Sequence, residues 1–159
     1  MTARNIRESD HETVVAIVNE WWGGRDMAWL LPRLFFSHSG DTSFAIEEGD
    51  ELVAFLIGFV SQSKEDEAYI HFVGVHPRRR GEGLGRRLYA MFFEEEARRR
   101  GCARVGCITS PVNKGSIAFH TRMGFRVEGG DAGAGGVPVH RDYDGPGEDR
   151  VAFAKTLAV

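Results

Sequence analysis

A strand followed by a loop rich in glycine and arginine, and then by an amphipathic helix, is the feature that most constrains this chain. Residues 69–75 are mostly β-forming, and Pro77 cannot continue a strand's hydrogen-bond ladder. Arg80, Gly83 and Gly85 then stand at R-x-x-G-x-G spacing before the helix. Glycine lets a backbone approach a ligand closely, and the first turn of a helix leaves N–H groups unpaired at the positive end of its dipole. The segment therefore predicts a site for a phosphate or a pyrophosphate.

The helix after the loop is predicted from residue 84 to about residue 100. Leu84 and Leu88 begin an apolar face at helical spacing. The opposite face is charged, and each glutamate of residues 94–96 stands four residues before an arginine of residues 98–100. We expect these residues to form ion pairs on a solvated face.

Two other classes of phosphate site are excluded by their motifs. The dinucleotide fingerprint G-x-G-x-x-G is out of phase with Gly81, Gly83 and Gly85, and no acid follows at the required distance. A Walker loop needs Gly-Lys-Ser/Thr, which the sequence lacks. Residues 78–100 hold eight arginines and four glutamates, but the chain's net charge is −3 and its pI is about 6.1. We therefore expect no nucleic-acid partner.

A second motif follows in residues 113–125, with a strand predicted over residues 104–109 between the two. It reads Asn113-x-x-Ser116-x-x-Phe119-His120-x-x-x-Gly124-Phe125. The two motifs, in this order and at this separation, resemble those of the GNAT superfamily of acyl-CoA-dependent N-acyltransferases. The resemblance is close over residues 51–125 and holds only in outline elsewhere.

The resemblance implies a fold and an activity. The fold would be a mixed α/β domain over residues 1–159, with a largely antiparallel sheet and helices on both faces. The activity would be transfer of the acetyl group of acetyl-CoA to a primary amine, by direct attack of the amine on the thioester. The alternative is a noncatalytic acyl-CoA-binding sensor or interaction domain on the same scaffold. The two functions share the cofactor site and differ in the roles of His71 and His120.

The resemblance also implies which residues bind acetyl-CoA. The first motif would wrap the pyrophosphate, and the strand before it would hold the pantetheine. In the second motif, Asn113 would contact the cofactor and Ser116 would be a small residue where the pantetheine passes. The residues are Val73, Val75, Arg80, Gly81, Gly83, Leu84, Gly85, Arg86, Asn113 and Ser116. Asn113 also stands where the N-cap of the following helix is predicted, and both roles are compatible. Gly74 suits close backbone approach, and a backbone N–H of residues 73–75 could stabilise the oxyanion.

His120 and His71 are the candidate catalytic residues. The family often has a tyrosine at the position of His120, taken to be the proton donor to the departing thiolate. An imidazolium could donate that proton near neutral pH, and the alternative is a histidine that only packs. His71 stands nine residues before Arg80, as in the serotonin-acetylating branch, and is the candidate base. It alternates with Val73 and Val75, so the three should share one face of the strand. The alternative role for His71 is structural, as a histidine whose hydrogen bond is satisfied by a neighbouring strand. Tyr69, on the same face, is the reserve candidate for the base.

The acceptor site is predicted from aromatic and acidic residues in two places. Trp22, Asp26 and Trp29 lie between the first two predicted helices, where the family builds its acceptor pocket. Tyr143 lies in an acidic, glycine-rich segment that could attract a cationic amine. Each prediction has an alternative. The tryptophans could anchor the core, and the charges of the loop could simply be solvated. The expected acceptor is a small-molecule or peptide amine.

Composition narrows the classes of protein to which the chain could belong. A chain of 159 residues with 42% hydrophobic and 27% charged residues is typical of one globular domain. No apolar run reaches the roughly 20 residues of a membrane span, and the N-terminus lacks a signal-peptide pattern, so we expect no membrane partner. Cys102 and Cys107 lack zinc-ligand spacing, which predicts reduced thiols in a cytoplasmic protein and no metal. The resemblance also allows a homodimer, since two-fold dimers are common in the family.

The remaining elements follow from periodicity and turn signals. Helices are predicted over residues 9–21, 27–37 with an interruption near Pro32, and 113–123. Strands are predicted over residues 42–47, 52–61, 67–75, 104–109 and 150–157, with another from Phe125. Residues 129–147 hold seven glycines and are predicted to form a loop.

Overall fold

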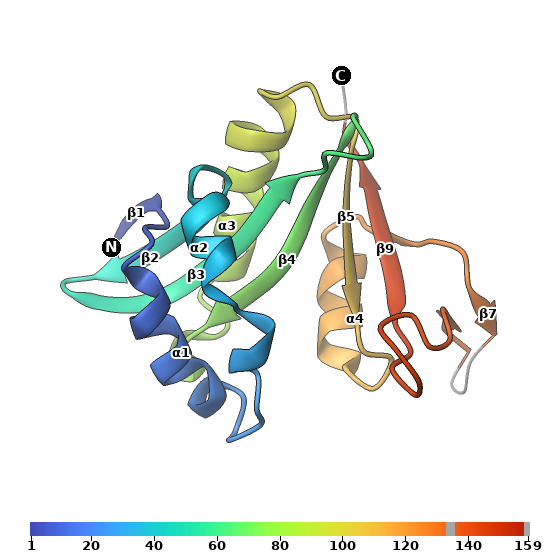
Figure 1. The fold of residues 1–159 in the computed structure, drawn as a ribbon, viewed down its shortest axis with the longest axis horizontal. Helices are drawn as coiled ribbons and strands as arrows, with labels where there is room; N and C mark the ends of the chain where they lie inside the picture. The colour runs from blue at the N-terminus through green and yellow to red at the C-terminus, as the bar shows by residue number, and fades with distance from the viewer. Residues whose placement is uncertain (133–135, 158–159) are drawn as a thin grey trace. The chain divides into compact units, whose positions relative to one another are not determined.

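The strands and helices that were predicted follow each other in the predicted order, and β1 (Thr2–Asn5), β7 (Asp131–Ala132) and β8 (Pro138–Val139) are additional (Figure 1). The computed structural model of the protein describes residues 1–132 and 136–157. These residues divide into two units: unit 1 is Met1–Val60 with Ile70–Glu96, and unit 2 is Ser61–Tyr69 with Ala97–Val159. The strand of residues 67–75 contributes to both units, which are described separately below.

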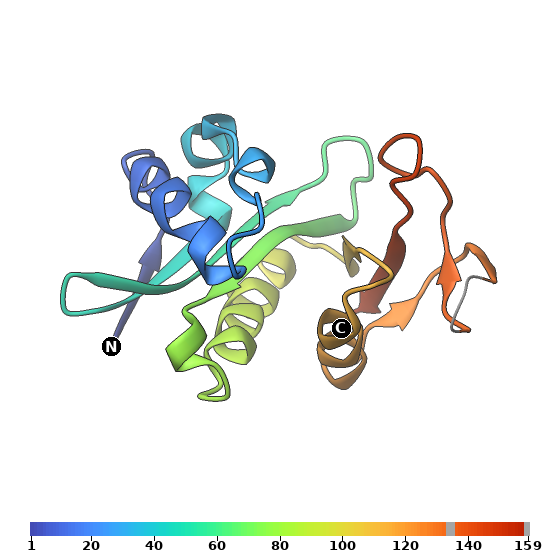
Figure 2. The same cartoon turned by 90° about the horizontal axis from the view of Figure 1, so that it is seen from below.

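Unit 1 packs helices on both faces of its strands. Its elements are β1 (Thr2–Asn5), α1 (Asp10–Trp21), the 3-10 helix η1 (Ala28–Leu30), α2 (Arg33–His38), η2 (Gly40–Thr42), β2 (Phe44–Glu48), β3 (Glu51–Val60), most of β4 (Glu67–Val75), η3 (Pro77–Arg79) and α3 (Leu84–Met91). β1 pairs antiparallel with β2, and β2 pairs antiparallel with β3. α1 and α2 cover one face and α3 covers the other (Figure 2). The interruption predicted near Pro32 is confirmed, because Pro32 separates η1 from α2. β1 lies outside the predicted elements.

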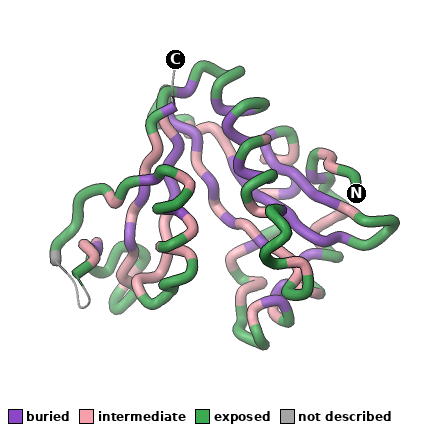
Figure 3. Tube along the Cα trace, turned by 180° about the vertical axis from the view of Figure 1, so that it is seen from behind, coloured by how far each residue is buried: buried purple, intermediate pink, exposed green. Residues whose placement is uncertain are grey.

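The core of unit 1 is built on β3, whose residues 52–58 are all buried (Figure 3). The ring of Phe55 stacks on Phe72 with 5.7 Å between ring centroids. A Cβ on Gly74 would lie 2.5 Å from the Phe55 ring. Gly74 is therefore required by the packing of Phe55, a reason other than the ligand approach expected from the sequence.

The helix predicted over residues 84–100 changes type part of the way along. α3 ends at Met91, and a π-helix follows over Phe92–Arg98. A π-turn closes over one more residue than an α-turn, so the side of the helix that each residue occupies shifts. Glu96 is only 4% exposed, whereas the sequence analysis placed it on the solvated face. Glu95 makes no hydrogen bond or ion pair with any residue that the structure describes, so the ion pair predicted for it is not formed.

Unit 2 is built on two central strands with a helix packed against them. Its elements are the start of β4, β5 (Arg104–Thr109), α4 (Lys114–Arg122), β6 (Arg126–Val127), β7 (Asp131–Ala132), β8 (Pro138–Val139) and β9 (Val151–Thr156). β4 pairs in parallel with β5 from Glu67 to Tyr69, and β9 pairs antiparallel with both β5 and β6. β7 and β8 form a short hairpin inside the predicted loop, part of which lies outside the described residues.

The predicted fold class is confirmed. Among the described residues the seven strands are hydrogen-bonded in the order β1-β2-β3-β4-β5-β9-β6. Pairing is mostly antiparallel, and the parallel β4–β5 pair makes the sheet mixed.

Candidate functional site

The loop before α3 presents a row of backbone amides. Gly81 and Gly83 adopt φ values of 82° and 80°, a left-handed conformation that other residues avoid. Gly83 is the N-cap of α3, and no side chain caps the helix. In the part of the chain that the structure describes, the N–H groups of residues 81–86 donate no hydrogen bond. Unpaired amides at the positive end of a helix dipole form an anion-binding arrangement, and a diphosphate fits its chemistry.

The arginines before this loop are held by protein groups. The Nη2 of Arg80 donates a hydrogen bond to the carbonyl oxygen of Trp21, at 2.8 Å. Trp21 is the last residue of α1, where a cation stabilises the negative end of the helix dipole. Arg79 forms ion pairs with Glu48 and Glu82. Arg80 therefore connects the loop before α3 to the end of α1, a role that its motif did not indicate.

The predicted alternation along β4 is confirmed in its burial pattern. His71, Val73 and Val75 are half-buried, and Phe72 and Gly74 between them are buried. The parallel ladder that β4 forms in unit 2 ends at Tyr69, so residues 73–75 lie beyond its last pair. Their backbone groups are the ones predicted to contact the acetyl-CoA thioester.

Two contacts within unit 1 help to hold His71 in place. Its Nε2 lies 2.6 Å from the carbonyl oxygen of Leu30, which can only accept, so Nε2–H donates. The ring stacks on Phe35 with 4.2 Å between centroids and 16° between planes. Nδ1 is consequently the atom at which neutral His71 would accept a proton. The hydrogen-bond partner of Nε2 belongs to the 3-10 helix η1 and not to a strand.

Asn113, Ser116 and His120 form a connected group at α4. The predicted N-cap is confirmed, because the Oδ1 of Asn113 accepts from the backbone N–H of Ser116 at 3.1 Å. The Nδ1 of His120 lies 2.7 Å from the carbonyl oxygen of Ser116, so Nδ1–H donates and Nε2 is the remaining titrating atom.

His120 lies in an aromatic environment. The residue is 8% exposed, and its ring packs against Phe119, Phe125 and Phe153, with centroids 5.5, 5.2 and 5.2 Å away. Burial lowers the pKa of His120, and the hydrogen bond to Ser116 opposes that shift only partly. Neutral His120 is therefore the main form at pH 7, and the imidazolium predicted from the sequence is a minor one.

Tyr69 does not suit the role of reserve base. Burial raises the pKa of its phenol, and the negative groups of unit 2, Tyr143 and Asp144 among them, raise it further. The phenol keeps its proton at neutral pH, so it can donate a hydrogen bond but cannot accept the proton of an amine.

The residues predicted for the acceptor occupy both units. In unit 1 the ring of Trp22 packs against Phe72, with 5.1 Å between ring centroids, and supports the core. Asp26 is exposed, and Trp29 is 64% exposed. In unit 2 Tyr143 is 50% exposed and contacts His140 edge to face.

The segment that carries Asp26 is shaped by Asn19, a residue that sequence reasoning missed. The Oδ1 of Asn19 accepts from the backbone N–H groups of Met27 and Ala28, at 2.7 and 2.9 Å. An asparagine near the end of a helix, just before Gly23 and Gly24, was the available signal.

Residues 1–132 and 136–157 contain neither a cluster of metal-binding side chains nor a helix that could span a membrane. No group of three or more His, Cys, Asp or Glu side chains there is arranged to hold a metal ion. No helix in those residues is both long enough and apolar enough to span a membrane.

Comparison with known proteins extends these observations. The family model described as "Acetyltransferase (GNAT) family" matches residues 5–125, which is more than half of the chain. A curated relative, the L-2,4-diaminobutyric acid acetyltransferase of Shouchella clausii, is 32% identical over 83 residues. That match covers 52% of this chain and 46% of the relative, so the chain spans about half the length of the curated protein it matches.

Solved structures share the fold. The ribosomal-protein-S18-alanine N-acetyltransferase of Escherichia coli has a TM-score of 0.72 and 23% identity, covering 99% of this chain and 94% of that one. The protein yncA of Salmonella typhimurium, solved with its cofactor acetyl-CoA, has a TM-score of 0.72 and 20% identity, covering 100% and 95%. With the family model matching across both predicted motifs, the chain belongs to the GNAT acetyltransferase family.

Proposed function

We propose that this protein transfers the acetyl group of acetyl-CoA, the cosubstrate of the GNAT family, to a primary amine. The observation that carries the proposal is the row of unpartnered amides at residues 81–86, in a chain that belongs to this family. We also propose that residues 1–159 act as one catalytic domain. The free, buried thiols of Cys102 and Cys107 support a reducing compartment, the cytoplasm.

We propose a role in binding acetyl-CoA for each of the predicted cofactor residues. The amides of Gly81, Gly83, Leu84, Gly85 and Arg86 hold the diphosphate, and the guanidinium groups of Arg80 and Arg86 add positive charge. The backbone of Val73 and Val75 holds the pantetheine and offers an N–H to the carbonyl oxygen as it becomes anionic. Ser116, on the first turn of α4, presents a small side chain to the pantetheine, and Asn113 fixes that turn through its N-cap bond.

The reaction needs two proton movements. The amine nitrogen attacks the thioester carbonyl carbon, the C–S bond breaks, the nitrogen loses a proton and the thiolate gains one. We assign removal of the amine proton to Nδ1 of His71, directly or through a water molecule. We assign delivery of a proton to the thiolate to Nε2 of His120. The low pKa of His120 makes its imidazolium a strong acid but a scarce one at pH 7.

The acceptor is proposed to be a small or peptide amine bound beside Trp22, Asp26, Trp29 and Tyr143. The exposed carboxylate of Asp26 would attract an ammonium group, and the exposed ring of Trp29 would attract a cation or an apolar side chain. The name of the Shouchella clausii relative makes 2,4-diaminobutyric acid the first small amine to test.

Thiol release from acetyl-CoA tests the proposal. The panel should contain 2,4-diaminobutyric acid, spermidine, other amino acids, an aminoglycoside, a lysine peptide and a peptide with an N-terminal alanine. Amine-stimulated thiol release with one class of amine, and a matching acetylated product by mass spectrometry, is the expected result. Acetyl-CoA binding by calorimetry without turnover of any amine would contradict the catalytic proposal.

One observation favours the alternative, a noncatalytic acyl-CoA sensor. One ring nitrogen of each candidate histidine is bonded to a main-chain carbonyl, as expected of histidines that only support the fold. A sensor would bind acetyl-CoA, release no thiol in the presence of amines, and bind equally well in His71→Gln and His120→Asn variants.

A further inference from the structure

Asn19, two residues before the end of α1, binds the chain that follows the helix at two places. Its side-chain Oδ1 accepts from the backbone N–H groups of Met27 and Ala28, at 2.7 and 2.9 Å. Both of those groups can only donate, so the amide oxygen of Asn19 faces them. Its main-chain carbonyl oxygen accepts from the N–H of Gly24, at 2.8 Å. Asn19 therefore folds the segment after α1 back onto the helix.

The connection between α1 and η1 has no helix or strand of its own. It begins with Gly23 and Gly24, at φ values of 67° and 90°, and glycine leaves many other conformations open at low cost. η1 is a single turn of three residues, too short to be stable by itself. The bonds that close this turn are accepted by the carbonyl oxygens of Met27 and Ala28, at 3.1 and 3.0 Å. Asn19 therefore holds the two residues on which η1 is built.

η1 in turn supplies the carbonyl group that orients the proposed base. Leu30 is the last residue of η1, and its carbonyl oxygen accepts from Nε2–H of His71 at 2.6 Å. A series of hydrogen bonds thus runs from the side chain of Asn19 to the start of η1, and from the end of η1 to His71. All of these residues belong to unit 1.

The same bonds place a proposed acceptor residue, Asp26. Asp26 directly precedes Met27, so the bond to the N–H of Met27 fixes the peptide group that joins the two residues. The side chain of Asp26 is exposed, as its proposed contact with an ammonium group requires. One half-buried asparagine therefore supports both the proposed base and the proposed acceptor carboxylate.

We propose that Asn19 is a positioning residue for acetyl transfer. It holds η1 so that the Leu30 carbonyl keeps Nδ1 of His71 available for the proton of the amine, and so that Asp26 meets the ammonium group. Asn19 acts through these residues and not on the reacting atoms. This inference rests on the proposed function, in which His71 is the base.

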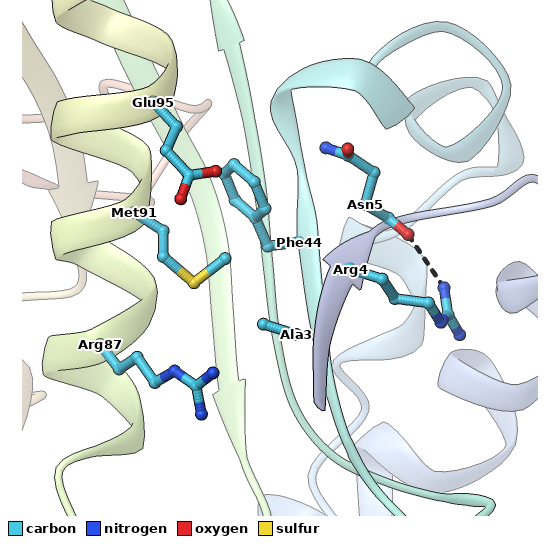
Figure 4. A pocket seen from close by; sticks show the side chains of 7 residues that line it. All are labelled: Ala3, Arg4, Asn5, Phe44, Arg87, Met91 and Glu95. Atoms are coloured by element: carbon cyan, nitrogen blue, oxygen red, sulfur yellow. Dashed lines mark hydrogen bonds between the residues drawn. The ribbon is translucent and has the colours of Figure 1, made fainter. Parts of the chain in front are cut away.

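Three variants test the role of Asn19. Asn19→Ala removes both side-chain bonds, and Asn19→Asp keeps an oxygen that can accept them. Asn5→Ala is the matched control, because Nδ2 of Asn5 also makes two bonds to main-chain groups of unit 1, the carbonyl oxygens of Ser43 and Asp41, at 3.1 and 3.3 Å. Asn5 lines a groove of about 410 Å³ between α3 and β1 (Figure 4), whose lining includes neither His71 nor Asp26.

Steady-state kinetics with an amine that the wild type acetylates gives the first readout. A displacement of the base by about 1 Å can cost roughly 100-fold in rate. Asn19→Ala is therefore expected to lower kcat/KM for the amine by about 10- to 100-fold, with the KM for acetyl-CoA unchanged. Asn19→Asp should restore most of this loss, and Asn5→Ala should stay close to the wild type.

NMR of the histidine rings gives a second readout that needs no substrate. A hydrogen-bonded N–H exchanges with water only when its bond opens, so Nε2–H of His71 should give a protected signal in ¹⁵N–¹H spectra. The signal is identified by its absence in His71→Gln. It should be lost in Asn19→Ala and kept in Asn19→Asp and Asn5→Ala.

Melting by circular dichroism checks that each variant is folded. If Asn19→Ala is not, Asn19→Ser takes its place, because its hydroxyl can accept only at shorter reach. The serine variant should show a loss of kcat/KM and a faster exchange of Nε2–H, each smaller than those expected for alanine.

The outcomes separate this inference from the proposed function. A wild type that acetylates an amine, with an alanine variant that matches Asn5→Ala in both rate and spectrum, would overturn the role of Asn19 and leave the proposed function standing. A loss of rate that Asn19→Asp does not restore, with the His71 signal intact, would also overturn it, since Asn19 would then only support the fold. A wild type that acetylates no amine would overturn the proposed function, and the positioning role with it.

Discussion

His71 donates its Nε2–H to the carbonyl oxygen of Leu30 across 2.6 Å, which joins the central strand β4 to the 3-10 helix η1. This bond fixes the tautomer of His71 and makes Nδ1 the basic atom of the neutral ring. A glutamine side chain can place its amide nitrogen near the position of Nε2 and so keep this bond without offering a base.

His71→Gln is therefore predicted to retain its fold and lose turnover. If Nδ1 removes the amine proton, kcat/KM should fall by about 10²–10³-fold, and its acidic limb in the pH–rate profile should disappear. Steady-state kinetics across pH, with chemical denaturation to check stability, gives the answer. Phe35→Leu removes the stacking contact but keeps the base, so it should retain that limb. A His71→Gln profile with the wild-type limb would show that another group is the base.

The buried state of His120 predicts a loss of stability at low pH. Well above pH 6.5 the residue is neutral in both the folded and the unfolded chain and contributes no pH dependence. Its pKa is lowered in the folded chain, so below pH 6.5 the unfolded chain binds the proton first and folding becomes less favourable. Urea denaturation at about pH 7.5 and about pH 5.5 should show a drop in the wild type that is smaller in His120→Asn.

Asparagine is chosen because its amide nitrogen can replace Nδ1 as the donor to Ser116. An equal drop in both proteins would mean that His120 does not titrate as described. In the same variant kcat should fall without a matching rise in the KM for acetyl-CoA, if Nε2 delivers the proton to the thiolate.

Gly83→Ala should weaken acetyl-CoA binding more than it weakens the fold. A left-handed alanine costs about 1–2 kcal/mol, and a Cβ at Gly83 would meet no atom within 4 Å. Gly49, in the turn between β2 and β3, has a φ of 62° and an equally open environment, which makes Gly49→Ala a matched control.

Both glycine variants should lose similar stability by denaturation, and only Gly83→Ala should lose affinity for acetyl-CoA by calorimetry. Equal affinity losses in the two variants, or none in either, would argue against the amides of residues 81–86 as the diphosphate site.

Gly74→Ala should destabilise the protein through Phe55. The new Cβ would lie 2.5 Å from the ring, and such overpacking costs about 1–3 kcal/mol. In a Phe55→Leu background the same substitution should cost about 1 kcal/mol less, because the ring edge is gone. A double-mutant cycle from urea denaturation measures this coupling. Additive effects would mean that Gly74 is needed for a reason other than the packing of Phe55.

The fold was predictable from the sequence because its signals are local. The strand of residues 67–75 and the strand of residues 104–109 were predicted at their observed bounds, since β-forming runs end there at turn residues. β1 escaped prediction, because four mostly polar residues, Thr2–Asn5, become a strand only through pairing with β2. The π-helix escaped it because glutamates and arginines four apart fit an α-helix equally well.

The candidate site was predictable in its residues but not in their contacts. Gly83 is a left-handed N-cap, and Asn113 is an N-cap through its side chain. Both roles are local to the start of a helix, so short sequence motifs identify such positions. The bond from His71 to Leu30 joins residues 41 apart in sequence, and that from Arg80 to Trp21 joins residues 59 apart. Spacing along the chain carries no information about such distant partners.

The π-helix of Phe92–Arg98 has a consequence for anyone who compares this protein with its relatives. In a relative whose helix stays α-helical throughout, the residue that points inward at this place would be the one just before or just after the position of Glu96. Aligning the two by residue number alone would exchange an inward position for an outward one, so a gap of one residue belongs in that stretch.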